Sequence, residues 1–101
     1  MRSLAFTPQA VDDLRNARRW YDEQRHGLGL EFESAVEAVL YRALNMPQSF
    51  PQALPGVRRA AVRRFPYDAY YRFDDHRLVV VLLFHTAQHP DKAMARLQQQ
   101  H

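Results

Sequence analysis

The chain has 101 residues, of which 47% are hydrophobic and 25% are charged, and this composition argues for one small globular domain and against wholesale disorder. It contains no cysteine, which excludes disulfides, thiolate metal sites and cysteine nucleophiles and suits a reducing compartment. Its longest apolar run, Leu78–Phe84, is far shorter than the roughly 20 residues that span a bilayer. We therefore expect a single domain over residues 1–101, without a signal peptide, located in the cytoplasm and with no membrane partner.

The N-terminal residues predict a short strand followed by a helix. Residues 3–6 are mostly apolar, and Thr7 directly precedes Pro8. This pair is typical of a helix start, because threonine caps the first turn and proline is favoured at the first helical position. The helix should end near the segment 24–27. Asp12 and Asp13 should complement the positive end of its dipole.

A second helix is predicted from about residue 28 to residue 45. Apolar residues recur there at steps of three and four, and Pro47 stops the pattern. Only a few residues separate the two helices, so we expect an antiparallel helical hairpin. The proline-rich segment 48–56 should be an ordered loop that leads into a sheet.

The segment from Val57 to His85 predicts three consecutive strands. Alternation within 67–73 places Tyr67, Ala69, Tyr71 and Phe73 on one face and Asp68, Tyr70 and Arg72 on the other. The run 78–84 is typical of a central strand covered on both faces. A last helix over 92–98 should follow. The fold class is thus α+β, with the hairpin packed on one sheet face and the face of Tyr70 and the arginines left open.

The candidate site is the basic cluster of the middle strands, comprising Arg58, Arg59, Arg63 and Arg64. A local positive field favours an anionic partner such as nucleic acid, phosphate or an acidic peptide. The alternative is a solvated face whose charges keep an edge strand from aggregating.

RNA cleavage offers one chemical use for this surface. It needs a base for the 2′-hydroxyl proton and cations for the phosphorane. Arg63, Tyr70, Arg72 and His85 contain the right atom types, but the same surface would bind a phosphate backbone or an acidic strand equally well.

Cofactor and metal signals are missing from the sequence. It has three glycines and no glycine-rich phosphate loop, and no H-E-x-x-H arrangement. His85 and His89 are four residues apart, but His85 should end a strand and Pro90 follows His89, so helical spacing does not apply. We expect no cofactor and no metal.

A set of short motifs, in collinear order over nearly the whole chain, resembles a known family. They are F-x-P-x-A at Phe6–Ala10, D-L at Asp13–Leu14, W-Y at Trp20–Tyr21, G-L-G-x-x-F at Gly27–Phe32, P-x-x-F-P at Pro47–Pro51, G-x-R-R at Gly56–Arg59, F-P-Y-x-x-Y-Y at Phe65–Tyr71, and the apolar strand ending at His85 with Pro90 beyond it. The combination is similar to the RelE/ParE toxin superfamily, particularly its ParE-like, plasmid-stabilisation branch.

The resemblance implies the toxin of a type II toxin–antitoxin pair, neutralised by a cognate antitoxin that wraps it in a hetero-oligomer. It implies two helices on a curved antiparallel sheet. RelE-like members are ribosome-dependent mRNA endoribonucleases, whereas ParE-like members poison DNA gyrase, inhibit growth and need no RNA-cleaving site.

Two RelE-like features are absent from this sequence. The arginine that RelE-like enzymes carry after the last strand falls at Gln88, and no tyrosine follows Tyr71. This favours the gyrase-binding function, although His85 or His89 could substitute in a nuclease, and a degenerate toxin that binds only antitoxin stays open. Taken together, the basic face and the resemblance give an anion- or partner-binding set of Arg58, Arg59, Arg63, Arg64, Tyr70, Arg72, Gln88 and His89.

Overall fold

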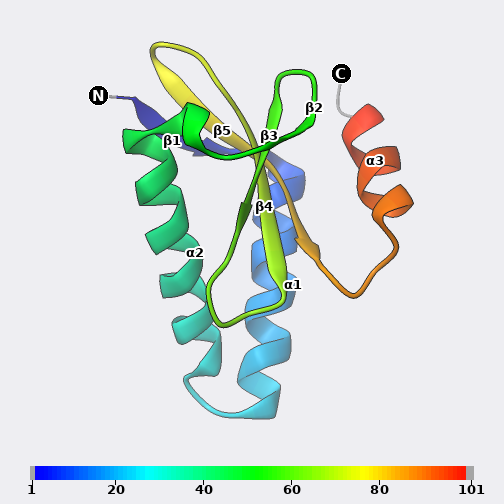
Figure 1. Cartoon of the computed structure of the whole chain (residues 1–101). Coiled ribbons are helices and arrows are strands. Elements are labelled where there is room, and N and C mark those ends of the chain that lie inside the picture. Colours follow the sequence, from blue (N-terminus) through cyan, green and yellow to red (C-terminus); the bar gives the residue numbers. More distant parts are fainter. Residues whose placement is uncertain (1, 100–101) are drawn as a thin grey trace.

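The computed structural model describes residues 2–99 as a five-stranded sheet with two long helices on one face and a short helix on part of the other (Figure 1). The elements in chain order are β1 (Ser3–Phe6), α1 (Pro8–Gln24), α2 (Leu28–Asn45), a 3₁₀ turn (Pro47–Ser49), β2 (Gln52–Leu54), β3 (Val57–Ala61), β4 (Tyr67–Phe73), β5 (Arg77–His85) and α3 (Pro90–Gln98). The predicted α+β arrangement is confirmed. Within the described residues, no helix combines the length and apolarity needed to cross a membrane.

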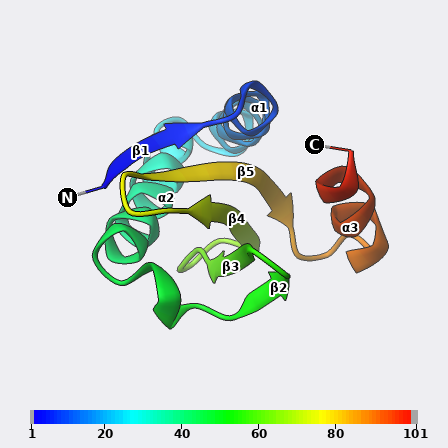
Figure 2. The same ribbon diagram turned by 90° about the horizontal axis from the view of Figure 1, so that it is seen from above.

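The strands are arranged in the order β1-β5-β4-β3-β2, which Figure 2 shows from above. Neighbouring strands from β5 to β2 are antiparallel, whereas β1 runs parallel to β5, so the sheet is mixed where the sequence suggested an antiparallel one. The short β2 lies in the segment expected to be a loop, and it pairs with β3 at the edge of the sheet.

The helical hairpin begins and turns where the sequence predicted. The side-chain oxygen of Thr7 accepts a hydrogen bond from the N–H of Ala10 at 3.2 Å, which caps α1. Gly27, with φ of 88°, provides the left-handed turn between the helices. Gly29 then brings the two helices close together, and its N–H donates to the carboxylate of Asp22 at 2.7 Å.

The main core lies between this hairpin and the sheet. Its aromatic part joins Tyr21, Phe32, Phe65 and Tyr67, whose ring centroids lie 4.9–6.2 Å apart. Phe32 is fully buried, a burial that stabilises the fold by about 1.5–3 kcal/mol. This core therefore packs both helices against the end of the sheet that carries the β3–β4 turn.

The opposite sheet face is not left open, contrary to the sequence expectation. Tyr70 is only 5% exposed, because Ala93 and Leu97 of α3 pack with it in a second apolar cluster. A bulge in β5 enlarges this cluster, since Tyr70 pairs with Leu82 and Tyr71 pairs with Val80. The intervening residue of β5 therefore adds a further apolar side chain to the face under α3.

Candidate functional site

Arg58 is held by backbone carbonyls of its own chain. Its guanidinium donates hydrogen bonds to the carbonyl of Gln48 at 3.1 Å and to that of Phe50 at 2.7 Å. It also lies 5.8 Å from the ring of Phe73. Arg58 pairs with Tyr71 and shares the helix-covered face of the sheet. This arginine secures the link between α2 and β2 through its Nη1, which makes both hydrogen bonds.

Arg59, Tyr70 and Arg72 belong to the face that α3 partly covers. Burial raises the pKa of Tyr70, the carboxylate of Asp68 raises it further, and the neighbouring Arg59 opposes both effects. Burial also raises the pKa of Asp68, with Arg59 again opposing the shift. Arg72 lines a separate hollow of about 310 Å³ together with Arg77. This face therefore carries mixed charges beside α3.

Arg63 and Arg64 lie in the β3–β4 turn and not on a middle strand, which corrects the sequence interpretation. The hairpin closes where the N–H of Val62 donates to the carbonyl of Tyr67 at 2.9 Å, so the four residues between them form the loop. Arg64 has φ of 70°, in the left-handed region that favours glycine. The loop directs both arginines toward α2, away from Tyr70 and Arg72.

On that side the two loop arginines meet Arg42 of α2 around a hollow of about 320 Å³. We call it the arginine hollow; its lining includes the apolar residues Ala35, Ala38 and Val39 and the basic residues Arg42, Arg63 and Arg64. Arg42 was not predicted as a site residue, because a single arginine on the exposed face of a helix carries no local signal that the β3–β4 turn packs beside it.

His85 lies at the end of β5, in a hollow of about 290 Å³ between α1, the sheet and α3. Its Nδ1 accepts a hydrogen bond from the N–H of Ala87 at 3.0 Å, and its ring packs edge-on against Tyr67 with centroids 5.1 Å apart. Burial raises the pKa of Tyr67, and Tyr21 and Asp13 raise it further. We call this the His85 hollow; Trp20, Gln88 and Arg96 also line it.

His89 caps α3. Its Nδ1 accepts a hydrogen bond from the N–H of Asp91 at 3.2 Å and lies 3.5 Å from the Asp91 carboxylate. The side chain is 69% exposed, so it remains accessible to solvent. Its place in the structure is thus the first turn of the last helix.

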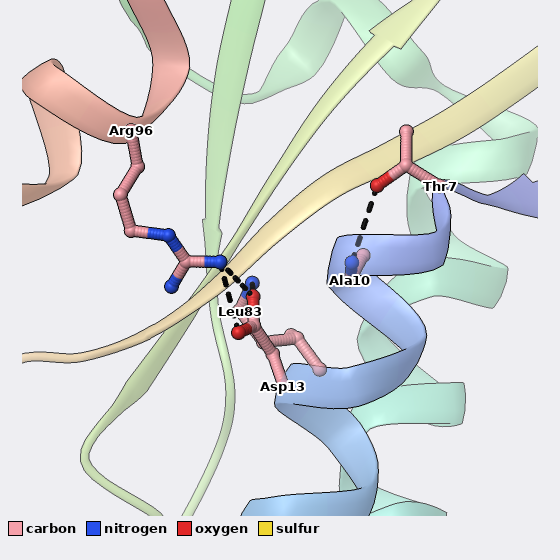
Figure 3. Close-up of polar contacts among 5 residues, drawn as sticks. All are labelled: Thr7, Ala10, Asp13, Leu83 and Arg96. Carbon is pink, nitrogen blue, oxygen red and sulfur yellow. Dashed lines mark hydrogen bonds and ion pairs between the residues drawn. The ribbon is translucent and has the colours of Figure 1, made fainter. Parts of the chain in front are cut away.

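Asp13 joins α1, β5 and α3, as Figure 3 shows. Its carboxylate accepts from the N–H of Leu83 at 3.1 Å, beyond the point where β1 has ended and left the edge of β5 unpaired. Both carboxylate oxygens accept from Arg96 of α3 at 2.9 Å. Asp12 and Asp13 were expected to complement the dipole of α1 from its first turns, but both lie beyond the first turn, which contains no acidic residue.

The four residues proposed for RNA cleavage are spread over the molecule. Arg63, Arg72 and His85 line three separate hollows. Tyr70 is buried under α3. His85 pairs with Tyr67 on the helix-covered side of the sheet, whereas Tyr70 and Arg72 occupy the other. The fold therefore offers several basic surfaces in place of one convergent site.

The sequence matches, over residues 4–90, the family described as the ParE toxin of the type II toxin–antitoxin system parDE. This match begins within β1, spans the other strands, the helical hairpin and the arginine hollow, and ends where α3 begins. The chain belongs to the ParE toxin family. The resemblance recognised in the sequence is thereby confirmed at the level of the family.

Solved structures support the same fold. The chromosomal ParDE toxin–antitoxin system from P. aeruginosa matches with a TM-score of 0.73 at 20% identity, over 84% of this ParE-family chain and 96% of the other. The E. coli DinJ–YafQ complex matches with a TM-score of 0.57, and YafQ from E. coli strain BL21(DE3) with 0.52; both are 16% identical and cover 86% of this chain and 96% of theirs. At these identities the likeness establishes the fold alone. No curated protein matches the sequence.

Proposed function

We propose that this ParE-family chain is a toxin that arrests growth by binding DNA gyrase and that a cognate antitoxin neutralises it. One observation carries the choice of target: the four residues predicted for RNA cleavage do not converge, because Arg63, Arg72 and His85 line three separate hollows and Tyr70 is buried under α3. Gln88, at the position where a nuclease would need a cation, lies in the His85 hollow and carries no charge. Recognition by charged surfaces fits this distribution better than catalysis does.

The antitoxin partner is supported by two relatives of known structure, since one is a ParDE system and the other a DinJ–YafQ complex. The chain itself is basic, with a formal net charge of +3. A basic toxin favours an acidic partner, because complementary charge speeds encounter and disfavours wrong partners. A protein encoded beside this gene is therefore the first candidate.

An assay of gyrase tests the proposed target. Purified chain, refolded if it must be freed from its antitoxin, is added to gyrase and relaxed plasmid, and supercoiling is followed on a gel. We expect inhibition that added antitoxin reverses. Undisturbed supercoiling at a large molar excess of folded chain would contradict the gyrase proposal.

The His85 hollow favours a second candidate, an mRNA endoribonuclease that acts on the ribosome. Because Nδ1 of His85 accepts the hydrogen bond from Ala87, the neutral imidazole carries its proton on Nε2, which can donate it as a general acid, and Arg96 lies in the same hollow. The likeness in fold to YafQ adds weight. In a translating extract, this candidate predicts mRNA cleavage that His85→Gln abolishes; intact mRNA would reject it.

A degenerate toxin would bind antitoxin and leave growth unaffected. Expressing the chain alone separates this alternative from the other two. If the cells grow normally while the folded chain accumulates, and it still co-purifies with its antitoxin, the degenerate alternative is correct.

A further inference from the structure

The arginine hollow combines an apolar base with a basic rim. Ala35 and Val39 of α2 are 9% and 2% exposed and form its base, while the exposed Ala38 leaves space beside them. Arg42, Arg63 and Arg64 surround this base, one from the helix and two from the β3–β4 turn. Such a site suits a ligand with an aliphatic group and negative charge on both sides of it.

The positive charge of the rim is not neutralised within the described residues. Arg18, Arg25 and Arg96 each pair with a carboxylate at 2.7–2.9 Å. No such ion pair joins the three rim arginines to any acidic group in residues 2–99. The guanidinium groups of Arg42 and Arg64 instead lie 5.7 and 6.0 Å from the rings of Phe50 and Phe65. These positions hold the cations without cancelling their charge.

The backbone of Arg64 adds an independent observation. Its φ of 70° lies in the region where a side chain costs free energy and glycine does not. An arginine in this conformation presents its guanidinium at the rim of the hollow. Local backbone strain of this kind is found where a side chain must be held for binding.

We propose that the arginine hollow is a docking site for an acidic segment of the antitoxin, one that inserts an aliphatic side chain between carboxylates. The inference rests on the proposed function. Charge complementarity specifies the acidic residues, and the apolar base specifies the aliphatic one. A nucleic acid fits less well, because no aromatic side chain lines the hollow to stack on a base.

The α1 side of the hairpin offers a matched control surface. Arg15 and Arg19 line a hollow of about 410 Å³, but Asp22 and Glu23 line it as well, so carboxylates already accompany its arginines. Both arginines are exposed, as the rim residues Arg63 and Arg64 are. A double substitution at Arg15 and Arg19 thus removes the same formal charge without touching the arginine hollow.

The experiment compares antitoxin affinity among variants of the full chain. The protein encoded beside the gene is tested as the antitoxin, and its dissociation constant is measured by titration calorimetry at 50 and 200 mM salt. We expect Arg42→Ala/Arg63→Ala to weaken binding at least tenfold and to reduce its salt dependence, and Arg15→Ala/Arg19→Ala to change it less than threefold.

A second variant fills the hollow instead of removing its rim. Ala38→Glu places a carboxylate at an exposed helix position beside the arginines, where it can neutralise them without disturbing the core. It should weaken antitoxin binding as the double variant does. Circular dichroism confirms that each variant is folded.

The outcomes distinguish a failure of the docking site from a failure of the proposed toxin function. Equal affinities for wild type and all folded variants would overturn the docking site and leave the toxin function standing. A wild-type chain that fails to bind the antitoxin would overturn the proposed function, and this inference with it. If the hollow variants lost the wild-type chain's binding to a labelled single-stranded RNA while their antitoxin affinity stayed unchanged, the hollow would be a nucleic-acid-binding site. That result would also overturn the inference.

Discussion

Single residues determine how α3 is held on the sheet. Asp13 accepts hydrogen bonds from both the β5 backbone and Arg96, and its side chain is 14% exposed. Removing its charge would leave the guanidinium of Arg96, whose side chain is only 28% exposed, without its charged partner. Loss of one member of a partly buried charged pair costs more than loss of an exposed one.

We predict that Asp13→Asn lowers the free energy of unfolding by about 1–3 kcal/mol, while keeping the size of the side chain. Urea unfolding followed by circular dichroism measures the difference. The control is Asp12→Asn, because Asp12 is exposed and adjacent in sequence; it should change stability by less than about 0.5 kcal/mol. Equal effects of the two variants would show that the Asp13 contacts contribute nothing specific.

Tyr71 links stability to alkaline pH. Its hydroxyl donates to the carbonyl of Pro47 at 2.6 Å, and burial raises its pKa from 10.0 to about 12. A pKa raised in the folded state means that the neutral hydroxyl stabilises the fold. This contribution is complete below pH 10 and is lost as the pH rises through 12.

We predict that the wild-type free energy of unfolding falls between pH 10 and 12, and that Tyr71→Phe falls less steeply over this interval. At pH 7 the variant should be less stable by about 1–2 kcal/mol, because the carbonyl of Pro47 loses its donor. Part of the alkaline decline should persist, since burial also raises the pKa of Tyr21, Tyr67 and Tyr70. Parallel pH profiles for variant and wild type would disprove the assignment to Tyr71.

At the scale of elements, the helical hairpin depends on a close approach at Gly29. A Cβ at this position would lie 2.5 Å from the carbonyl oxygen of Arg18 and 2.7 Å from the carboxylate of Asp22. Helix propensity and packing therefore make opposite predictions for an alanine. Propensity alone would stabilise α2 by about 1 kcal/mol.

We predict that the steric clash outweighs the gain in helix propensity. Gly29→Ala should lower the free energy of unfolding by about 1–3 kcal/mol, because the two helices must move apart. Ser34→Ala, at an exposed position of the same helix, should be neutral or slightly stabilising. Chemical denaturation of both variants provides the comparison. A Gly29→Ala variant more stable than wild type would mean that α1 and α2 do not approach this closely.

The helices and long strands were predictable because their signals are local. Thr7 with Pro8 gave the start of α1, and alternation gave the faces of β4. The packing of α3 on the sheet face of Tyr70 was not predicted, although two features of the sequence indicate it. The run of β5 is apolar on both faces, and Ala93 and Leu97 lie four residues apart on one side of the last helix.

The candidate site was less predictable, because its geometry depends on contacts distant in sequence. Strand alternation puts Arg58 on the same face as Ala60, but only the pairing with Tyr71 and the connection after α2 show that its Nη1 donates hydrogen bonds within the fold. The meeting of Arg42 with Arg63 depends on how the β3–β4 turn packs on α2. The periodicity of a single sequence does not predict a contact between a turn and a helix that are distant along the chain.

At the scale of the whole molecule, the two candidate binding surfaces lie at different helices of the hairpin. The arginine hollow lies on the side of α2, and the His85 hollow lies between α1, the sheet and α3. Because they are distinct, a toxin can use one surface for its antitoxin while another meets its target. Variants of the arginine hollow should therefore separate antitoxin binding from growth arrest.

Pulse labelling of growing cells after induction of the chain alone tests the central claim most directly. The rates of DNA and protein synthesis are compared over the first minutes, with uninduced cells as the reference. Binding to gyrase predicts that DNA synthesis falls first and that a DNA-damage response follows. Protein synthesis that stops first, while DNA synthesis continues, would contradict this account and would make His85 the next residue to substitute.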